Sequence, residues 1–515
     1  MRLNKPFAFY FFVFIMDMKK SAFDFCMKAP SLLTVKKGNA VRHLLLLIYT
    51  FTCTALFSCS SKEYKDIVPK DSPAIARINL SALKNDAQLS DEQASAFVKK
   101  VIPFAPGLDL SQPVYAFVSP GRYFGFLFAV DDGDVLKKSI MQAAEISSLR
   151  DGGGLEWAVW KGSWQMAWND DALLMLGPVS TSERAFVTRT MAAMFNSDEG
   201  MSDGNLYPCI EAMDEDVAIA ANADVLPSVY GKLLALPLGK NADLSDIRIV
   251  TGVTLKGNEI RLSNVLESKQ DNITLTNDGF LKPYEGLFKP VANANTPVVA
   301  LMGINGNELY KQLSSNKDIN MLLMALSMDF SIDKITKNIN GDVAVRLNGL
   351  DSSGKPNVTI NAAIDNGNAV RKIFKQDKLS VRSSDGYSRR INTGRASDFW
   401  GKYIELCYSD KEMLTFTNET QQPQKDYNKS DTTTNGNSNF NAAVGKFCYV
   451  HVNCPAMSNL EFTESLLGGK ISEILHGMES LEFSLSDATH SQLVIRLNNN
   501  ILSKPTTDSR RNSTE

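Results

Sequence analysis

The feature that most constrains the fold of this 515-residue chain is a set of short patterns that recur in the same order. The segment AVDDGD at 129–134 is matched by AIDNGN at 363–368. Four further pairs keep that order: 73–76 with 297–300, 167–170 with 407–410, 219–222 with 450–453, and 260–262 with 495–497. Their separations stay within roughly 220–240 residues, which is typical of a tandem duplication with changes in loop length. We therefore predict two related halves, residues 59–285 and 286–500.

Each half alternates short strands with amphipathic helices. Strands joined by tight turns predict antiparallel pairing, so we expect an α+β fold of two tandem related halves, each an antiparallel sheet with helices packed on one face. The second half departs from the first at residues 418–445, which are rich in Asn, Thr, Gln and Ser. Such a stretch has too few apolar side chains to offset its ordering entropy, which predicts a disordered insert. The polar tail at 501–515 is likewise predicted to be disordered.

The N-terminal region predicts export and anchoring. Basic residues precede an apolar run at 44–57, which is too short for a membrane-spanning helix of roughly 20 residues but suits a secretory signal. The run ends in Leu56-Phe57-Ser58-Cys59, which resembles the lipobox of bacterial lipoproteins. This resemblance implies removal of residues 1–58 as leader and signal peptide, and acylation of Cys59.

The residues that follow Cys59 have mixed charge and lack the acidic run that exports some similar lipoproteins of the Bacteroidota to the cell surface. We therefore expect an outer membrane lipoprotein that faces the periplasm, with surface exposure as the alternative. The only membrane contact that we predict is the N-terminal lipid anchor.

Composition excludes some functions. The net charge of −3 and the lack of a basic cluster argue against a nucleic-acid partner. Beyond Cys59, the chain contains Cys209, Cys407, Cys448 and Cys454, too few for a disulfide scaffold in so long a chain. Their disulfide state is left open by the sequence.

Four tryptophans lie in one predicted hairpin whose turn is centred on Lys161-Gly162. With a two-residue loop, Trp157, Trp164 and Trp168 share one face, and Trp160 points away. A flat aromatic platform of this kind would stack on a sugar ring or a lipid-linked ligand. The alternative is a core-facing aromatic ladder. The matching positions in the second half are Ile404 and Tyr408, ordinary core residues of a strand, which favours the ladder.

No motif predicts a metal, a cofactor or a catalytic residue. Cys448 and Cys454 share strand parity while His451 has the other, and structural zinc needs four ligands. The turn at 131–134 contains several acidic residues but lacks the spacing of a calcium loop, so turn and helix N-cap roles explain it equally well. Neither GxSxG nor HExxH occurs.

The lipobox, together with IVPKDSPAIARINLSAL at 67–83 and GLDLSQPVYAFV at 107–118, resembles uncharacterised lipoproteins of the Bacteroidota grouped as a domain of unknown function. That resemblance implies location and class, and assigns no functional residue. We expect a lipid-anchored envelope protein with a non-enzymatic binding or scaffolding role, whose partner is an unknown envelope protein or glycan. Two alternatives are a periplasmic enzyme with dispersed catalytic residues, and a lipid or glycan carrier that uses the tryptophan-rich hairpin.

Overall fold

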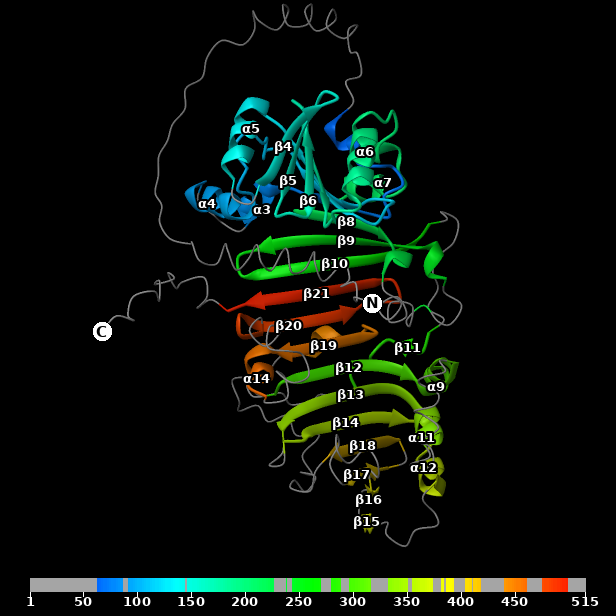
Figure 1. Cartoon of the computed structure of the whole chain (residues 1–515). Coiled ribbons are helices and arrows are strands. Elements are labelled where there is room, and N and C mark those ends of the chain that lie inside the picture. The colour runs from blue at the N-terminus through cyan, green and yellow to red at the C-terminus, as the bar shows by residue number, and fades with distance from the viewer. Residues whose placement is uncertain are drawn as a thin grey trace, which may run out of the picture. The chain divides into compact units, whose positions relative to one another are not determined.

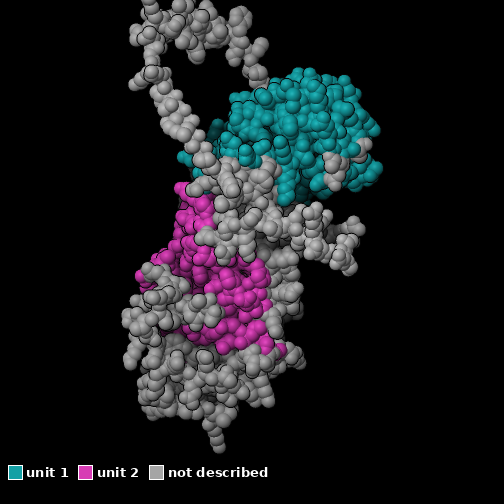
Figure 2. Space-filling model, turned by 90° about the vertical axis from the view of Figure 1, so that its left-hand side faces the viewer, with its two compact units in different colours: residues 1–221, 502–515 teal, residues 222–501 magenta. Residues whose placement is uncertain are grey.

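The chain forms two compact units, residues 1–221 with 502–515 (unit 1) and residues 222–501 (unit 2) (Figure 2). The computed structural model describes residues 63–86, 91–143, 146–226, 238, 243–269, 279–288, 296–315, 332–350, 354–373, 381–383, 386–392, 403–409, 411–417, 440–460 and 475–498. The predicted leader and the predicted tail lie outside these ranges. The division that the sequence predicts at 285 and 286 stays a prediction.

The described strands of unit 1 form one antiparallel sheet in the order β8-β1-β2-β3-β7-β6-β5-β4 (Figure 1). The strands are β1 Ala74–Ile78, β2 Val114–Val118, β3 Phe124–Ala129, β4 Ile146–Gly152, β5 Leu155–Trp160, β6 Trp164–Trp168, β7 Ala172–Gly177 and β8 Val217–Asn222. The helices are η1 Tyr64–Ile67, α3 Leu80–Asp86, α4 Asp91–Val101, α5 Gly133–Gln142, α6 Arg184–Phe195, η2 Met201–Asp203 and α7 Tyr207–Glu211.

Helices cover both faces of the unit 1 sheet. On one face, Val187 and Met191 of α6 pack in the core with Leu174 of β7. Trp157 of β5 packs against this same core, so its neighbour Glu156 points to the opposite face. Lys137 of α5 forms an ion pair with Glu156, which places α5 on that opposite face. Figure 1 shows α5 and α6 on opposite sides of β4, β5 and β6.

The prediction that helices pack on one face is therefore wrong for unit 1. The physical reason lies in β7, whose sequence ALLMLG is a continuous apolar run and not an alternation. All of its residues are buried. A strand with apolar side chains on both faces needs cover on both.

The described strands of unit 2 form an antiparallel sheet in the order β9-β10-β21-β20-β19-β12-β13-β14-β18-β17-β16-β15, with β11 pairing with the end of β12 (Figure 1). The strands are β9 Ile247–Lys256, β10 Glu259–Ser268, β11 Leu281–Lys282, β12 Val298–Asn305, β13 Ile339–Leu350, β14 Pro356–Ile364, β15 Val381–Ser383, β16 Gly386–Asn392, β17 Tyr403–Tyr408, β18 Glu412–Thr417, β19 Cys448–Asn453, β20 Met478–Leu485 and β21 His490–Leu497. The helices are η3 Ala223–Val225, η5 Leu244–Asp246, α9 Gly306–Ser315, α11 Ile332–Asn338, α12 Gly367–Ile373, η7 Phe440–Ala443 and α14 Cys454–Ser458.

Within unit 2, the run β19-β12-β13-β14-β18-β17-β16-β15 has the same order as the whole sheet of unit 1. Ile304 belongs to a core cluster that includes residues of α9, α11 and α12, and Leu301 belongs to a second cluster with Tyr284 and Tyr449. The mixed α and β composition and the antiparallel pairing are confirmed, with strands dominant. None of the helices in the described ranges is both long enough and apolar enough to span a bilayer.

The insert predicted to be disordered at 418–445 lies largely outside the described residues, but its end is ordered. Residues Phe440–Ala443 form η7, and Ala443 is fully buried. The Phe440 ring lies 6.2 Å from the Tyr449 ring in a T-shaped arrangement. The prediction is therefore wrong for 440–445, because an aromatic side chain with a partner in the core anchors a stretch whose average composition is polar.

Candidate functional site

The chain enters the core of unit 1 a few residues after the predicted anchor. Cys59 itself lies outside the described residues, which begin at Glu63. The Tyr64 hydroxyl donates a hydrogen bond to the Pro113 carbonyl at 2.6 Å. Ile67 is 5% exposed and Val68 is fully buried in the core cluster that contains α6 and α7. We call residues 63–72 the strap, because this segment attaches the N-terminal part of the chain to the folded unit.

Polar contacts of Lys65 add to this attachment. Its ammonium group donates a hydrogen bond to the Tyr207 hydroxyl at 2.9 Å and lies 2.7 Å from the Glu63 carboxylate. Burial opposes the charged form of Lys65, but the hydrogen bonds with Glu63 and Tyr207 outweigh it and raise the pKa of the lysine. The Tyr207 hydroxyl in turn donates to Glu211 at 3.1 Å, so the strap is joined to α7.

The strap also contacts the loop that follows α6. The backbone N–H of Ser202 donates to the Asp66 carboxylate at 2.9 Å. Gly200 lies so close to Asp66 that a β-carbon added at position 200 would stand 2.3 Å from the backbone oxygen of Asp66. Lys70 forms an ion pair with Glu199 at 2.5 Å. The strap is thus enclosed by two segments that lie far from it in the sequence.

The tryptophan hairpin has a different register from the one predicted. Trp160 pairs directly with Trp164, so the loop holds three residues, and Lys161 and Gly162 both have positive φ. One extra loop residue moves every following side chain to the other face. Trp160, Trp164 and Trp168 therefore share a face, and Trp157 points away. The predicted grouping of Trp157 with Trp164 and Trp168 is wrong.

The shared face is a packed aromatic layer in which each ring has a neighbour. Trp160 meets Phe104 edge-on at 5.6 Å, and Trp164 lies 5.7 Å from Phe126. Trp168 is only 1% exposed. On the other face, the Trp157 indole N–H donates to the Gly152 carbonyl at 3.2 Å. These contacts are those of a core-facing ladder, in which Trp168 has no open surface for a ligand to stack on.

The cysteine and histidine candidates lie on β19 and at the start of α14. Burial raises the pKa of the Cys448 thiol to about 11 and that of the Cys454 thiol to about 12. The described residues contain no group of three or more His, Cys, Asp or Glu arranged to hold a metal ion. His451 instead faces Glu482, its direct partner on β20.

His451 and Glu482 begin a row of alternating basic and acidic side chains that sequence reasoning missed. The row crosses four strands and continues through Arg496 to Glu259 and Arg261. His451 Nδ1 lies 3.8 Å from Glu482, Arg496 forms a close ion pair with Glu482, and Arg496 Nε lies 3.5 Å from Glu259. The pairings of β19 with β20, of β20 with β21 and of β21 with β10 bring these residues together, so no local sequence signal marks the row.

The neighbouring His451 imidazole, followed by the contacts with Arg496, lowers the pKa of Glu482 to about 2. Its side chain is 25% exposed, so this carboxylate is a half-buried anion held between two basic groups. Opposite charges on neighbouring strands stabilise sheet pairing. A carboxylate beside an imidazole can also orient the ring for proton transfer. The row therefore has a structural role and one feature of a catalytic pair.

The acidic turn after β3 serves as a helix cap. The Asp132 carboxylate accepts a hydrogen bond from the Val135 N–H at 2.9 Å and so caps α5. The turn and N-cap interpretation of this segment is confirmed for Asp132.

Comparison with known proteins gives a family but no activity. Residues 92–476 match the family described as "Domain of unknown function (DUF4836)". No match is found among the curated proteins. The chain is similar to two solved structures described as crystal forms IV and III of TP0453, at 12% identity and a TM-score of 0.28. These alignments cover 40% and 42% of this chain and 81% and 83% of those chains, and so low a score supports no argument. Because the family match extends over more than half of the sequence, the chain belongs to the domain-of-unknown-function family DUF4836.

Proposed function

We propose that this protein is a lipoprotein of the cell envelope, anchored through acylated Cys59 on the periplasmic face of the outer membrane, with a non-enzymatic binding or scaffolding role. One observation carries the proposal: the lipobox-like sequence ending at Cys59 is followed within a few residues by the buried strap. A signal peptide cut directly before Cys59 would leave the whole strap in the mature chain. The two acyl chains of a lipoprotein are sufficient for stable membrane attachment.

The test is metabolic labelling with a radioactive fatty acid, followed by membrane fractionation. The parent chain is expected to incorporate label and to sediment with the outer membrane, whereas Cys59→Ala incorporates none and its precursor stays uncleaved. Cys53→Ala is the matched control, because Cys53 lies in the same apolar run and should leave labelling unchanged. Equal labelling of parent and Cys59→Ala contradicts the proposal.

We further propose that the two halves of the mature chain are related by duplication. The identical strand order of the unit 1 sheet and of the run from β19 to β15 supports this. The register agrees as well: Ala129 opposite Ala172 and Trp168 opposite Leu173 in unit 1 correspond to Ala363 opposite Glu412 and Tyr408 opposite Met413 in unit 2. Two similar sheets provide two similar surfaces, which suits a scaffolding role better than a single reaction centre.

A second candidate function, a periplasmic enzyme, is favoured by one observation, the His451–Glu482 pair with its lowered carboxylate pKa. Activity-based profiling of envelope extracts with the parent chain and His451→Gln tests it, since an enzyme would show a product that the variant does not make. The third candidate, a lipid or glycan carrier, would have to use Trp160 and Trp164, because Trp168 is buried.

A further inference from the structure

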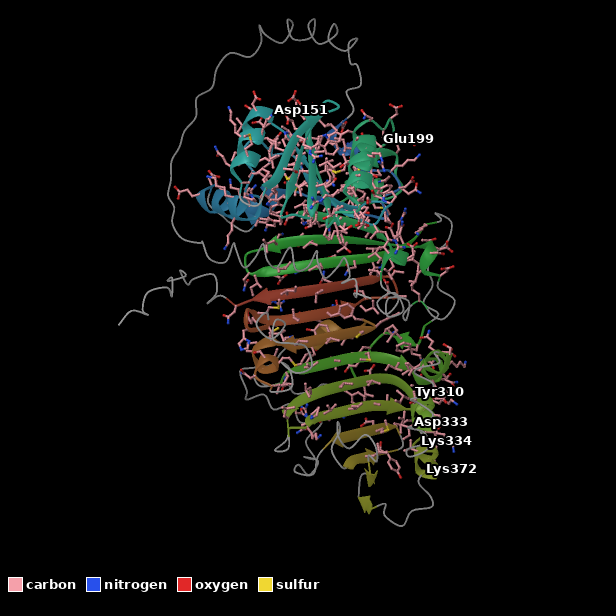
Figure 3. All side chains as sticks on the ribbon, viewed as in Figure 1. Asp151, Glu199, Tyr310, Asp333, Lys334 and Lys372 are labelled. Carbon is pink, nitrogen blue, oxygen red and sulfur yellow. The ribbon has the colours of Figure 1, made fainter. Side chains whose placement is uncertain are left out.

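The strap lies on one face of unit 1. Three segments in mutual contact define this face: the strap itself, the loop at 199–203 and helix α7 at 207–211. We call this surface the anchor face. Its contacts are the Ser202–Asp66 hydrogen bond, the Lys70–Glu199 ion pair and the Lys65–Tyr207 hydrogen bond. Figure 3 shows Glu199 beyond the end of α6. Glu63 and Glu199 project from this face, with side chains 66% and 62% exposed.

The covalent reach from the anchor to this face is short. Four residue steps separate Cys59 from Glu63, and a fully extended chain spans at most about 3.6 Å per residue, so the two α-carbons are at most about 14 Å apart. A domain of about 160 residues has a radius of gyration of about 15 Å, so its full width is well over twice this reach. An acylated Cys59 lies at the membrane surface. The body of unit 1 can then avoid the bilayer only by turning the anchor face toward it.

From this geometry we propose that the anchor face lies against the phospholipid headgroups of the membrane that holds Cys59, and that α4 faces away from them. The inference rests on the proposed acylation and adds an orientation to it. Figure 1 shows α4 on the other side of the unit 1 sheet from α6 and α7. Lys99 on α4 is exposed and marks that distant side.

Electrostatic attraction does not explain a contact between the anchor face and lipid headgroups. Its charged residues are two lysines and six acids: Lys65, Lys70, Glu63, Asp66, Asp71, Glu199, Asp203 and Glu211. Anionic headgroups repel such a surface, whereas polybasic segments are attracted to them. The contact with lipid is therefore imposed by the length of the tether, and because salt screens the repulsion, raising the ionic strength should not weaken it.

The experiment places a photoreactive residue at single positions of the full acylated chain in its native membrane. Glu63→p-benzoylphenylalanine and Glu199→p-benzoylphenylalanine are expected to give phospholipid adducts on illumination. Lys99→p-benzoylphenylalanine, the matched control, should give at least fivefold fewer. Adducts are identified by radioactive phosphate in the lipid and by mass spectrometry.

A second variant tests the role of tether length. An insertion of about 20 Gly and Ser residues after Ser61 adds a flexible reach of about 25 Å and should lower the Glu199 adduct several-fold. Raising the salt concentration should not lower the yield of the Glu199 adduct with the parent tether. Equal adducts from Glu199 and Lys99, adducts to protein in place of lipid, or no effect of the insertion would each overturn the orientation. Fatty-acid labelling of the same samples shows separately whether the anchor itself has failed.

Discussion

The sheets of the two units share a strand order, but equivalent faces of these two sheets are covered in different ways. In unit 1, the face that carries Ile75 is covered by α6, whose Met191 is fully buried in the core. By strand register, Ile75 corresponds to Val299 of unit 2, which packs with Tyr284 and η7 within the described residues. Both units thus pack a preceding segment on this face, but unit 1 adds the helix α6 and unit 2 adds the short 3-10 turn η7.

The segment before the first strand is also held differently in the two units. In unit 1, the Pro113 carbonyl accepts the Tyr64 hydroxyl. By register, Asp342 of unit 2 stands at the position of Pro113, because Ala74 faces Val118 as Val298 faces Leu347. The Asp342 carboxylate is 2% exposed and accepts the backbone N–H groups of residues 285 and 287 at 2.7 and 2.6 Å. At this position unit 1 therefore uses a backbone carbonyl that accepts a side-chain hydroxyl, whereas unit 2 uses a buried carboxylate that accepts two backbone N–H groups.

Truncation of α6 should give the largest effect. Met191→Ala removes a fully buried side chain from the unit 1 core and should lower its free energy of unfolding by about 2–5 kcal/mol. Urea denaturation followed by tryptophan fluorescence measures it, because four of the five tryptophans lie in unit 1. Met141→Ala on α5, where the side chain is 61% exposed, should stay within about 0.5 kcal/mol of the parent. Similar losses in both variants would show that α6 is not an essential cover.

Removal of the buried charge in unit 2 should come next. Asp342→Ala leaves two backbone N–H groups without their acceptor, and hydrogen bonds to a charged group contribute about 1.5–3 kcal/mol. Hydrogen exchange at residues 285–287 should accelerate at least tenfold, as measured by mass spectrometry. Glu412→Gln, an exposed acid on β18, serves as the control and should leave that exchange unchanged. Unchanged protection in Asp342→Ala would contradict the idea that this carboxylate holds the segment.

The charged row predicts a pH dependence that is confined to unit 2. The pKa of Glu482 falls from its ordinary value of 4.5 to about 2, so the folded state binds this proton less readily than the unfolded chain. Its contribution to stability is therefore complete above about pH 4.5 and is lost as the pH falls toward 2. Glu482→Gln should be destabilised by about 2 kcal/mol at pH 7 and should vary less than the parent between pH 5 and about 2. Thermal melts of the parent and of Glu482→Gln across this pH range measure the difference in stability. Identical pH profiles for the two proteins would contradict a stabilising role for the ionised Glu482 carboxylate.

The places where sequence and structure agree are local, and the places where they disagree depend on register or on distant pairing. Asp132 was recognisable as a cap because its carboxylate and the Val135 N–H that donates to it lie three residues apart. The face of Trp160 was predicted wrongly because one extra loop residue inverts the parity of the hairpin. The row from His451 to Glu259 could not be foreseen, since it requires β10 to pair with β21 across more than 200 residues of sequence.

The smallest expected effect tests whether equivalent caps contribute equally in the two units. Asp132 caps α5 after β3, and Asn366 stands at the same place before α12 after β14, accepting the Asn368 N–H at 2.9 Å. Loss of an N-cap side chain costs about 1 kcal/mol, so Asp132→Ala and Asn366→Ala should each lower the stability of their own unit by that amount. Lys138→Ala, exposed on α5, is the control for helix propensity and should not destabilise. Local hydrogen exchange in α5 and α12 measures both losses. If only one helix responds, the two turns share a sequence pattern without sharing a structural role, and the proposed duplication is then supported by strand order and register but not by the caps.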